Sequence, residues 1–336
     1  MSLWRRRLCS LAHTAGVTRL LDRNIGVRIL TYHSVTSSPT NDVPEAQSAA
    51  LFREQLEFIQ RRFRVVSLKN AVESMGDLSA TKNARPALVI TFDDGFLDNY
   101  ECAFPCLRHF GIPATVFVVT DFLDRGRVPW PTRLREIMQH ARRHAHPAHP
   151  GIDLSSDLTR RSTASRLKGL LARLTPDARF ATIDRLVNDL EAPPSQIRPL
   201  TWAQVRMMAS AGIAFGSHTV FHSILPEMPD DIVEMELDIS RKRLEAELGV
   251  EYPTVAYPNG GFDSRILRIA QGCGYCAGVT QRTGSNSQNS NLLALHRVQI
   301  PPNCNEGVVG ALLVRAAWRG PLEHATRRLP RIAHNE

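Results

Sequence analysis

Apolar residues alternate along this chain between short continuous runs and longer stretches in which they fall on one helical face. A run of about four to eight apolar residues bounded by turn residues is typical of a strand buried on both sides. Such runs predict strands at 27–32, 87–92, 114–119, 213–216 and 254–257, and near 275–280 and 293–300. Stretches with helical periodicity predict helices near 49–63, 97–110, 202–211, 230–248, 263–271 and 305–317.

Polar residues and glycines mark where several of these helices begin and end. Thr201 and Gln204 form a capping box at the start of one helix, and Asp230 or Asp231 is expected to cap another. Gly111, Gly212 and Gly249 follow helices as stop signals. Because strands and helices alternate, the pattern predicts an α/β fold with a largely parallel, closed or nearly closed barrel.

Residues 125–200 interrupt this alternation. The segment is Arg-rich and helix-like and has no clear strand, which predicts a helical insertion near the rim of the barrel. Its histidine-rich tract could bind a metal, but a polar loop is the favoured interpretation because the spacing fixes no ligand geometry. The tract contains His140, His144, His146 and His149.

Composition narrows the range of functions. Of 336 residues, 43% are hydrophobic and 22% charged, as in an ordinary globular protein. A net charge of +8 is compatible with an anionic partner. The basic residues are scattered and not interleaved with aromatics, so nucleic-acid binding is not expected. Nor does the sequence indicate an obligate protein partner.

The N-terminal segment, 1–25, is basic, with Arg5 to Arg7 near its start, and its broken apolar part lacks a clear cleavage site. We therefore expect a cytoplasmic protein, in which this segment either lies on the inner membrane as a basic amphipathic helix or packs on the domain. A single catalytic domain is expected at 26–320, followed by a basic tail at 321–336. The six cysteines form no regular framework, and Cys273 and Cys276 are interpreted as packing residues rather than a redox or metal pair.

Polar residues with metal-binding chemistry follow three of the predicted strands. His33, Asp93, Asp94, His218 and His222 would meet at one edge, because the carboxyl ends of parallel strands face the same side of a sheet. Adjacent carboxylates resist joint ionisation unless a cation lies between them or one has a raised pKa. Histidines four residues apart would share one face of a helical turn and could bind one ion. This set predicts a metal-dependent hydrolase.

Two of these motifs, Thr91-Phe92-Asp93-Asp94-Gly95 and Ser217-His218-Thr219-Val220-Phe221-His222, resemble those of the polysaccharide deacetylases, carbohydrate esterases that share the NodB homology domain. The resemblance covers roughly 27–300 apart from the insertion, with support from 111–115, 202–216 and 256–260. It implies a distorted (β/α) barrel and removal of an N-acetyl group from an amino sugar in a polysaccharide or glycolipid. It also implies a role for each of several residues: Asp93 as catalytic base, Asp94, His218 and His222 as metal ligands, and Tyr257, Pro258 and Asn259 in substrate binding.

The chain departs from the family pattern in two places. Ala256 stands where the family commonly has an arginine that orients the base. The late motif that supplies the catalytic acid is ambiguous at His296, whereas His33 follows its strand as in deacetylases of exopolysaccharide pathways with permuted motif order. We therefore favour His33 as general acid, with His296 as the alternative.

Zn²⁺ is the expected metal, although a carboxylate and two imidazoles also accept Co²⁺ or Ni²⁺. Two other functions remain open. One is hydrolysis of another non-peptide C–N bond by the same site, and the other is a catalytically weakened carbohydrate-binding domain, which Ala256 suggests.

Overall fold

The computed structural model describes residues 26–37, 46–75, 85–146 and 149–326. The predictions for the N-terminal segment 1–25, including its contact with a membrane, fall outside these ranges. Within them, no helix is both long and apolar enough to cross a bilayer. The five cysteines in the described ranges are free, and Cys273 packs against an apolar cluster, as the packing interpretation predicts.

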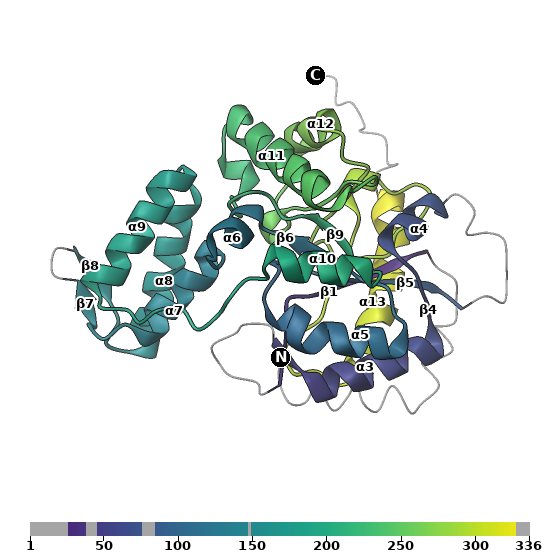
Figure 1. Ribbon diagram of the computed structural model, residues 1–336, viewed down its shortest axis with the longest axis horizontal. Coiled ribbons are helices and arrows are strands. Elements are labelled where there is room, and N and C mark those ends of the chain that lie inside the picture. The colour runs from purple at the N-terminus through teal and green to yellow at the C-terminus, as the bar shows by residue number, and fades with distance from the viewer. Residues whose placement is uncertain (1–25, 38–45, 76–84, 147–148, 327–336) are drawn as a thin grey trace, which may run out of the picture.

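An eight-stranded, wholly parallel sheet curls into a nearly closed barrel, which confirms the predicted fold (Figure 1). Its strand order is β11-β10-β9-β6-β5-β1-β12, and β4 pairs with the start of β5. A bridge between Val279 and Leu295 brings the chain before β12 beside β11 and nearly completes the ring. The strands are β1 (Arg28–Tyr32), β4 (Arg64–Val65), β5 (Ala87–Phe92), β6 (Thr115–Val118), β9 (Ala214–Ser217), β10 (Thr254–Ala256), β11 (Ala277–Val279) and β12 (Val298–Gln299).

Register places the ends of β1 and β5 at the same level. Every residue of both strands is buried, as their continuous apolar runs predict. Tyr32 is the Cα partner of Phe92, and the Asp93 amide donates to the Tyr32 carbonyl at 3.0 Å. His33 and Asp93 therefore leave the sheet side by side.

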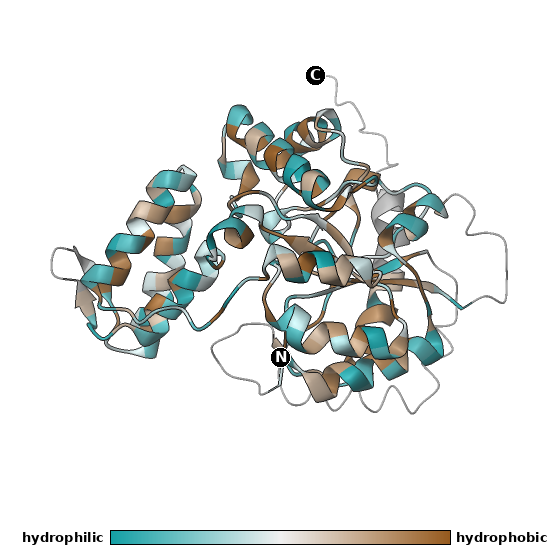
Figure 2. Ribbon diagram, viewed as in Figure 1, coloured by the Kyte–Doolittle hydropathy of each residue, from teal (hydrophilic) through white to brown (hydrophobic). Residues whose placement is uncertain are grey.

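Helices cover the outside of the barrel, with their apolar residues turned towards the strands (Figures 1 and 2). The capping box of Thr201 and Gln204 is present, and Gly111 and Gly249 end their helices in the left-handed conformation. The prediction that Asp230 or Asp231 caps its helix is wrong, because Pro229 holds that position and both aspartates lie in the first turn. The helices are α3 (Ala49–Arg62), α4 (Leu68–Glu73), α5 (Phe104–Phe110), α10 (Trp202–Ser210), α11 (Asp230–Leu248), α12 (Ser264–Gly272) and α13 (Glu306–Thr326).

Short elements complete the rim. The helix predicted from residue 97 begins as a π-helix, η1 (Asn99–Ala103), which has more residues per turn than an α-helix and leads directly into α5. β2 (Ser34–Thr36) and β3 (Ala46–Ser48) form a separate two-stranded sheet beyond β1. Three 3₁₀ turns follow in the second half of the chain: η2 (Leu225–Glu227), η3 (Pro258–Gly260) and η4 (Leu292–Ala294).

The predicted insertion forms a lobe beside the barrel (Figure 1). After α6 (Thr120–Arg125), the chain builds α7 (Trp130–His140), α8 (Asp157–Ala172) and α9 (Pro176–Asp189), which enclose an apolar cluster of their own. The segment, which has no clear strand by sequence, contains two short ones: β7 (Ala145–His146) and β8 (His149–Asp153) form a small antiparallel hairpin within the histidine-rich tract. We call residues 130–190 the helical lobe.

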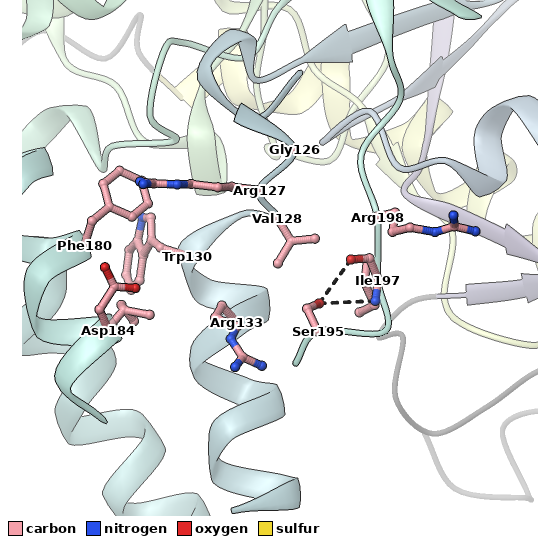
Figure 3. Close-up of a pocket in the computed structure, with 11 residues that line it drawn as sticks. Gly126, Arg127, Val128, Trp130, Arg133, Phe180, Asp184, Ser195, Ile197 and Arg198 are labelled. Carbon is pink, nitrogen blue, oxygen red and sulfur yellow. Dashed lines mark hydrogen bonds between the residues drawn. The ribbon is translucent and has the colours of Figure 1, made fainter. Parts of the chain in front are cut away.

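A cavity of about 320 Å³ lies where the helical lobe meets the barrel (Figure 3). Its walls come from both parts: Trp130 and Phe180 belong to the lobe, whereas Ile197 and Arg198 belong to the chain that returns to the barrel. The Arg127 guanidinium lies 5.0 Å from the centre of the Phe180 ring. Trp130 is itself 1% exposed and connects this cavity to the site described next.

Candidate metal and catalytic site

Two adjacent carboxylates follow β5 at the centre of the barrel rim. The backbone turns sharply there, with φ of 71° at both Asp94 and Gly95. A Cβ at Gly95 would lie 2.8 Å from Cγ1 of Val118, so glycine is required by both conformation and space. Asp93 and Asp94 are 1% and 8% exposed, and the turn directs them into one region, as the sequence predicts.

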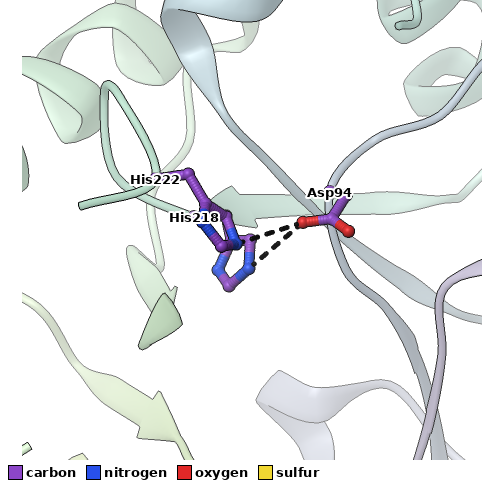
Figure 4. Close-up of side chains that lie close together, drawn as sticks. All are labelled: Asp94, His218 and His222. Carbon is purple, nitrogen blue, oxygen red and sulfur yellow. Dashed lines mark ion pairs between the residues drawn. The ribbon is translucent and has the colours of Figure 1, made fainter. Parts of the chain in front are cut away.

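Two histidines approach Asp94 from the loop after β9, residues 218–223, which we call the histidine loop (Figure 4). Nε2 of His218 lies 3.6 Å and Nε2 of His222 3.4 Å from Oδ1 of Asp94. The prediction that the two histidines share a helical turn is wrong: the loop is irregular, and Thr219 and His222 have positive φ. The predicted convergence on one point is nevertheless present.

The three side chains suit a divalent metal. Among the residues that the structure describes, they form a group whose ligand atoms all lie within 4.8 Å of one another. Tetrahedral zinc ligands lie about 3.3 Å apart when each is ~2.0 Å from the ion, close to the distances seen here. Oδ1 of Asp94 is buried and accepts no hydrogen bond, which leaves it able to bind a cation. The residues therefore fit the metal that the sequence implies.

Protonation states also favour ligation. Nδ1 of His218 lies 2.7 Å from the Ala256 carbonyl, which can only accept, so Nδ1 carries the proton. The lone pair of Nε2 therefore faces the space beside Oδ1 of Asp94, where a cation would bind. Burial lowers the pKa of His218 to about 4, although the nearby Asp93 charge opposes this, so the ring is neutral near pH 7. Burial raises the pKa of Asp94, but the interaction with the adjacent His222 ring outweighs it and keeps this carboxylate ionised.

Arg297 holds the carboxylate of Asp93, the role that Ala256 cannot fill. Its Nη1 and Nη2 donate to the two carboxylate oxygens of Asp93 at 2.7 and 2.6 Å, and both side chains are 1% exposed. Its Nε donates to the Thr280 carbonyl at 2.9 Å, which aims the guanidinium along the barrel interior. Our sequence reasoning missed Arg297. One signal could have identified it: Arg297 is the one arginine in the stretch near 293–300 that is predicted to be a buried strand.

The pairing sets the charge state of Asp93. Burial alone raises the pKa of this carboxyl, because it disfavours the charged form. Arg297, through its charge and its hydrogen bonds, is the main influence that opposes burial, and the pKa of Asp93 lies below its usual value. Asp93 is therefore an ionised carboxylate in a buried site.

His33 lies beside both carboxylates. It is half-buried, and its charge lowers the pKa of Asp93 and of Asp94. Its backbone is held by η1, since Nδ2 of Asn99 donates to the His33 carbonyl at 2.9 Å. The neighbouring Asp98 accepts a hydrogen bond from the Ser34 hydroxyl.

His296 is placed near the other end of the barrel. Val298 pairs with Leu30 in parallel register, so His296 is level with Arg28, about 16 Å below His33 at ~3.3 Å per residue. Its amide and carbonyl both bond to the side chain of Asn286 at 2.8 Å. This position favours His33 as the residue that can reach the site.

The three predicted substrate-binding residues differ in exposure. Tyr257 is fully buried, and its hydroxyl donates to the Leu293 carbonyl at 2.9 Å, so its side chain packs between the barrel and η4. Pro258 is also buried. Asn259 is exposed and has φ of 54°, so it is the member of this group with a side chain open to solvent.

Comparison with known proteins identifies the family of this chain. The family model described as Polysaccharide deacetylase matches residues 80–278, more than half of the chain, including Asp93, Asp94, His218 and His222. The chain belongs to the polysaccharide deacetylase family. It is a hydrolase that removes N-acetyl groups from polysaccharide, so the binding-domain alternative is wrong, and Arg297 removes the reason for it.

The individual relatives are distant in sequence but align over most of this chain. YxkH of Bacillus subtilis (strain 168), provisionally described as a polysaccharide deacetylase, is 23% identical over 85% of this chain and 75% of its own length. Streptococcus pyogenes deacetylase PplD in complex with acetate aligns over 87% of this chain and 98% of its own, with 21% identity and a TM-score of 0.59. IcaB from Ammonifex degensii aligns over 88% and 98%, with 18% identity and a TM-score of 0.58. These likenesses support the barrel fold.

Proposed function

We propose that this deacetylase is metal-dependent and that Asp93 and His33 are its general base and general acid. The observation that carries the proposal is the arrangement of Asp93: a buried, ionised carboxylate held by Arg297, next to a separate group of one carboxylate and two imidazoles. Two adjacent aspartates thus have different surroundings, which favours different roles.

Asp94, His218 and His222 would hold the ion, which we expect to be Zn²⁺, with Co²⁺ or Ni²⁺ as alternatives. When bound there, a divalent ion supplies Lewis acidity towards the acetyl carbonyl and makes water more acidic. Three protein ligands would leave the ion accessible to water or substrate, as in catalytic rather than structural zinc sites. Metal analysis of the wild type and of His218→Ala tests this set, because equal metal content in the two proteins would exclude His218.

Asp93 would take one proton from the water that attacks the acetyl carbon. Arg297 holds both oxygens of Asp93, and each oxygen retains a second lone pair that can accept that proton. His33 would protonate the nitrogen as the C–N bond breaks, since an amine leaves readily only when protonated. The products are acetate and a free amino sugar, so one water is consumed for each amide cleaved.

The substrate is best sought among N-acetylated hexosamine polymers, with lipid-linked N-acetyl sugars as the second class. Release of acetate should be measured from both classes and from simple acetamides, with and without a chelator. Acetate from the polymers supports the proposal. Acetate from the lipid-linked sugars alone would point to a glycolipid substrate, whereas turnover of the acetamides alone would support hydrolysis of another C–N bond.

A further inference from the structure

The histidine loop has an unusual backbone at two positions. Thr219 and His222 have φ of 69° and 55°, in the left-handed region that residues with a Cβ rarely adopt, above all a β-branched one such as Thr219. Conformations of this kind persist where surrounding contacts hold them. The position of the two histidine rings therefore depends on what surrounds the loop.

One set of contacts comes from the barrel's own helices. Glu236 of α11 is fully buried, and its Oε2 accepts hydrogen bonds from the amides of Val220 and Phe221, both at 2.8 Å. Thr120, at the start of α6, donates its amide to the Thr219 carbonyl at 3.2 Å. These bonds fix the segment between the two histidines.

A second set comes from the helical lobe. Nε1 of Trp130 on α7 donates to the His222 carbonyl at 2.9 Å. Nη1 of Arg179 on α9 donates to the Ser223 hydroxyl at 3.0 Å, and its other two nitrogens donate to carbonyls of the lobe at 2.9 and 2.8 Å. The Arg179 guanidinium lies 5.1 Å from the centre of the Trp130 ring, and both side chains are almost completely buried.

We propose that the helical lobe is a positioning element of the metal site: Trp130 and Arg179 hold the histidine loop from one side while Glu236 holds it from the other. These residues contact the backbone and the hydroxyl of the loop, not the ligand atoms, so they act through His222. The proposal rests on His218 and His222 being metal ligands. Outer contacts of this kind typically change metal affinity about 10- to 100-fold when removed.

Single hydrogen bonds can be removed with little change in shape. Trp130→Phe deletes the indole N–H and retains an aromatic ring. Ser223→Ala deletes the hydroxyl that Arg179 contacts and that also lies beside Glu236. Trp202→Phe is a matched control, because Nε1 of Trp202 makes a comparable bond of 2.7 Å to the exposed Asp124, outside the histidine loop.

The measurement is titration of the metal-free, full-length protein with Co²⁺, followed by visible absorption, with circular dichroism to check folding. We expect Trp130→Phe and Ser223→Ala to bind Co²⁺ about 10-fold more weakly and with an altered spectrum, and Trp202→Phe to match the wild type. A purely structural role would lower stability without changing the spectrum of the bound ion.

Wild-type affinity and spectrum in both folded variants would overturn the inference. If Trp130→Phe does not fold, Ser223→Ala decides alone, and failure of both to fold while Trp202→Phe folds would also overturn it. A wild type that binds no Co²⁺ would instead remove the metal site itself, which separates failure of the proposed function from failure of this inference.

Discussion

Arg297 and Asp93, 204 residues apart in the sequence, form a buried pair joined by two hydrogen bonds of 2.7 and 2.6 Å. The pair completes a site that the local motif leaves incomplete, since Ala256 cannot provide the charge. A guanidinium that holds both carboxylate oxygens fixes the orientation of the base as well as its ionisation.

Replacing Arg297 should therefore change the pH dependence of the reaction. Without its charge the pKa of Asp93 rises, so the base becomes protonated at a higher pH and activity at the acid end is lost first. For the neutral variant Arg297→Gln we expect a fall in kcat of roughly 10²-fold, with the acid limb moved to higher pH and metal content unchanged. A pH–rate profile identical to the wild type would show that Arg297 does not tune the base.

Substitutions of Asp93 and Asp94 should have different effects on metal content and turnover. Asp93→Asn should retain metal and lose roughly 10²–10⁴-fold in turnover, because it can no longer accept a proton. Asp94→Asn should lose metal, since its Oδ1 faces both histidines. Metal content and acetate release should be measured on both variants. If Asp93→Asn lost the ion and Asp94→Asn kept it, the two roles would be the reverse of those proposed.

His33 and His296 form a second matched pair. His33→Ala should lower kcat by roughly 10²-fold or more with little change in metal content, because the leaving nitrogen would lose its proton donor. His296→Ala should leave turnover near the wild-type value, since His296 lies level with Arg28, away from the rim. If His296→Ala lost turnover and His33→Ala did not, the general acid would be His296.

Asp98 should make stability depend on pH. Burial raises its pKa to about 7, although hydrogen bonds from Ser34 and Val35 oppose the shift. The folded pKa lies above the unfolded value of about 4, so its contribution to stability is complete below pH ~4 and is lost as pH rises through about 7. Asp98→Asn, neutral at every pH, should not show that part of the loss.

Denaturant unfolding of the wild type and of Asp98→Asn from pH 4 to 8 tests this expectation. The free energy of unfolding of the wild type should fall relative to that of the variant across the window. A constant difference would mean that Asp98 is ionised in the folded protein throughout.

The parts of the site that lie close in sequence could be predicted from it. The buried run before Asp93, and Gly95 after it, define the turn that presents both carboxylates, because local sterics suffice there. The apolar run of β1 and the polar residue after it likewise place His33 at the rim.

The parts that depend on distant contacts could not be predicted in this way. A helical turn is the simplest geometry for His218 and His222, but hydrogen bonds to Trp130 and Glu236 hold the loop in another backbone conformation. Arg297 reaches Asp93 only because β12 and β5 both flank β1 in the barrel, a pairing that no local pattern specifies.

The most direct test of a metal-dependent deacetylase centred on Asp94, His218 and His222 is acetate release from an N-acetylhexosamine polymer by the metal-free protein as Zn²⁺ is added back. The account predicts no release without metal, full recovery at one Zn²⁺ per chain, and no recovery in His222→Ala. Acetate release that persists at the wild-type rate after complete metal removal would contradict it.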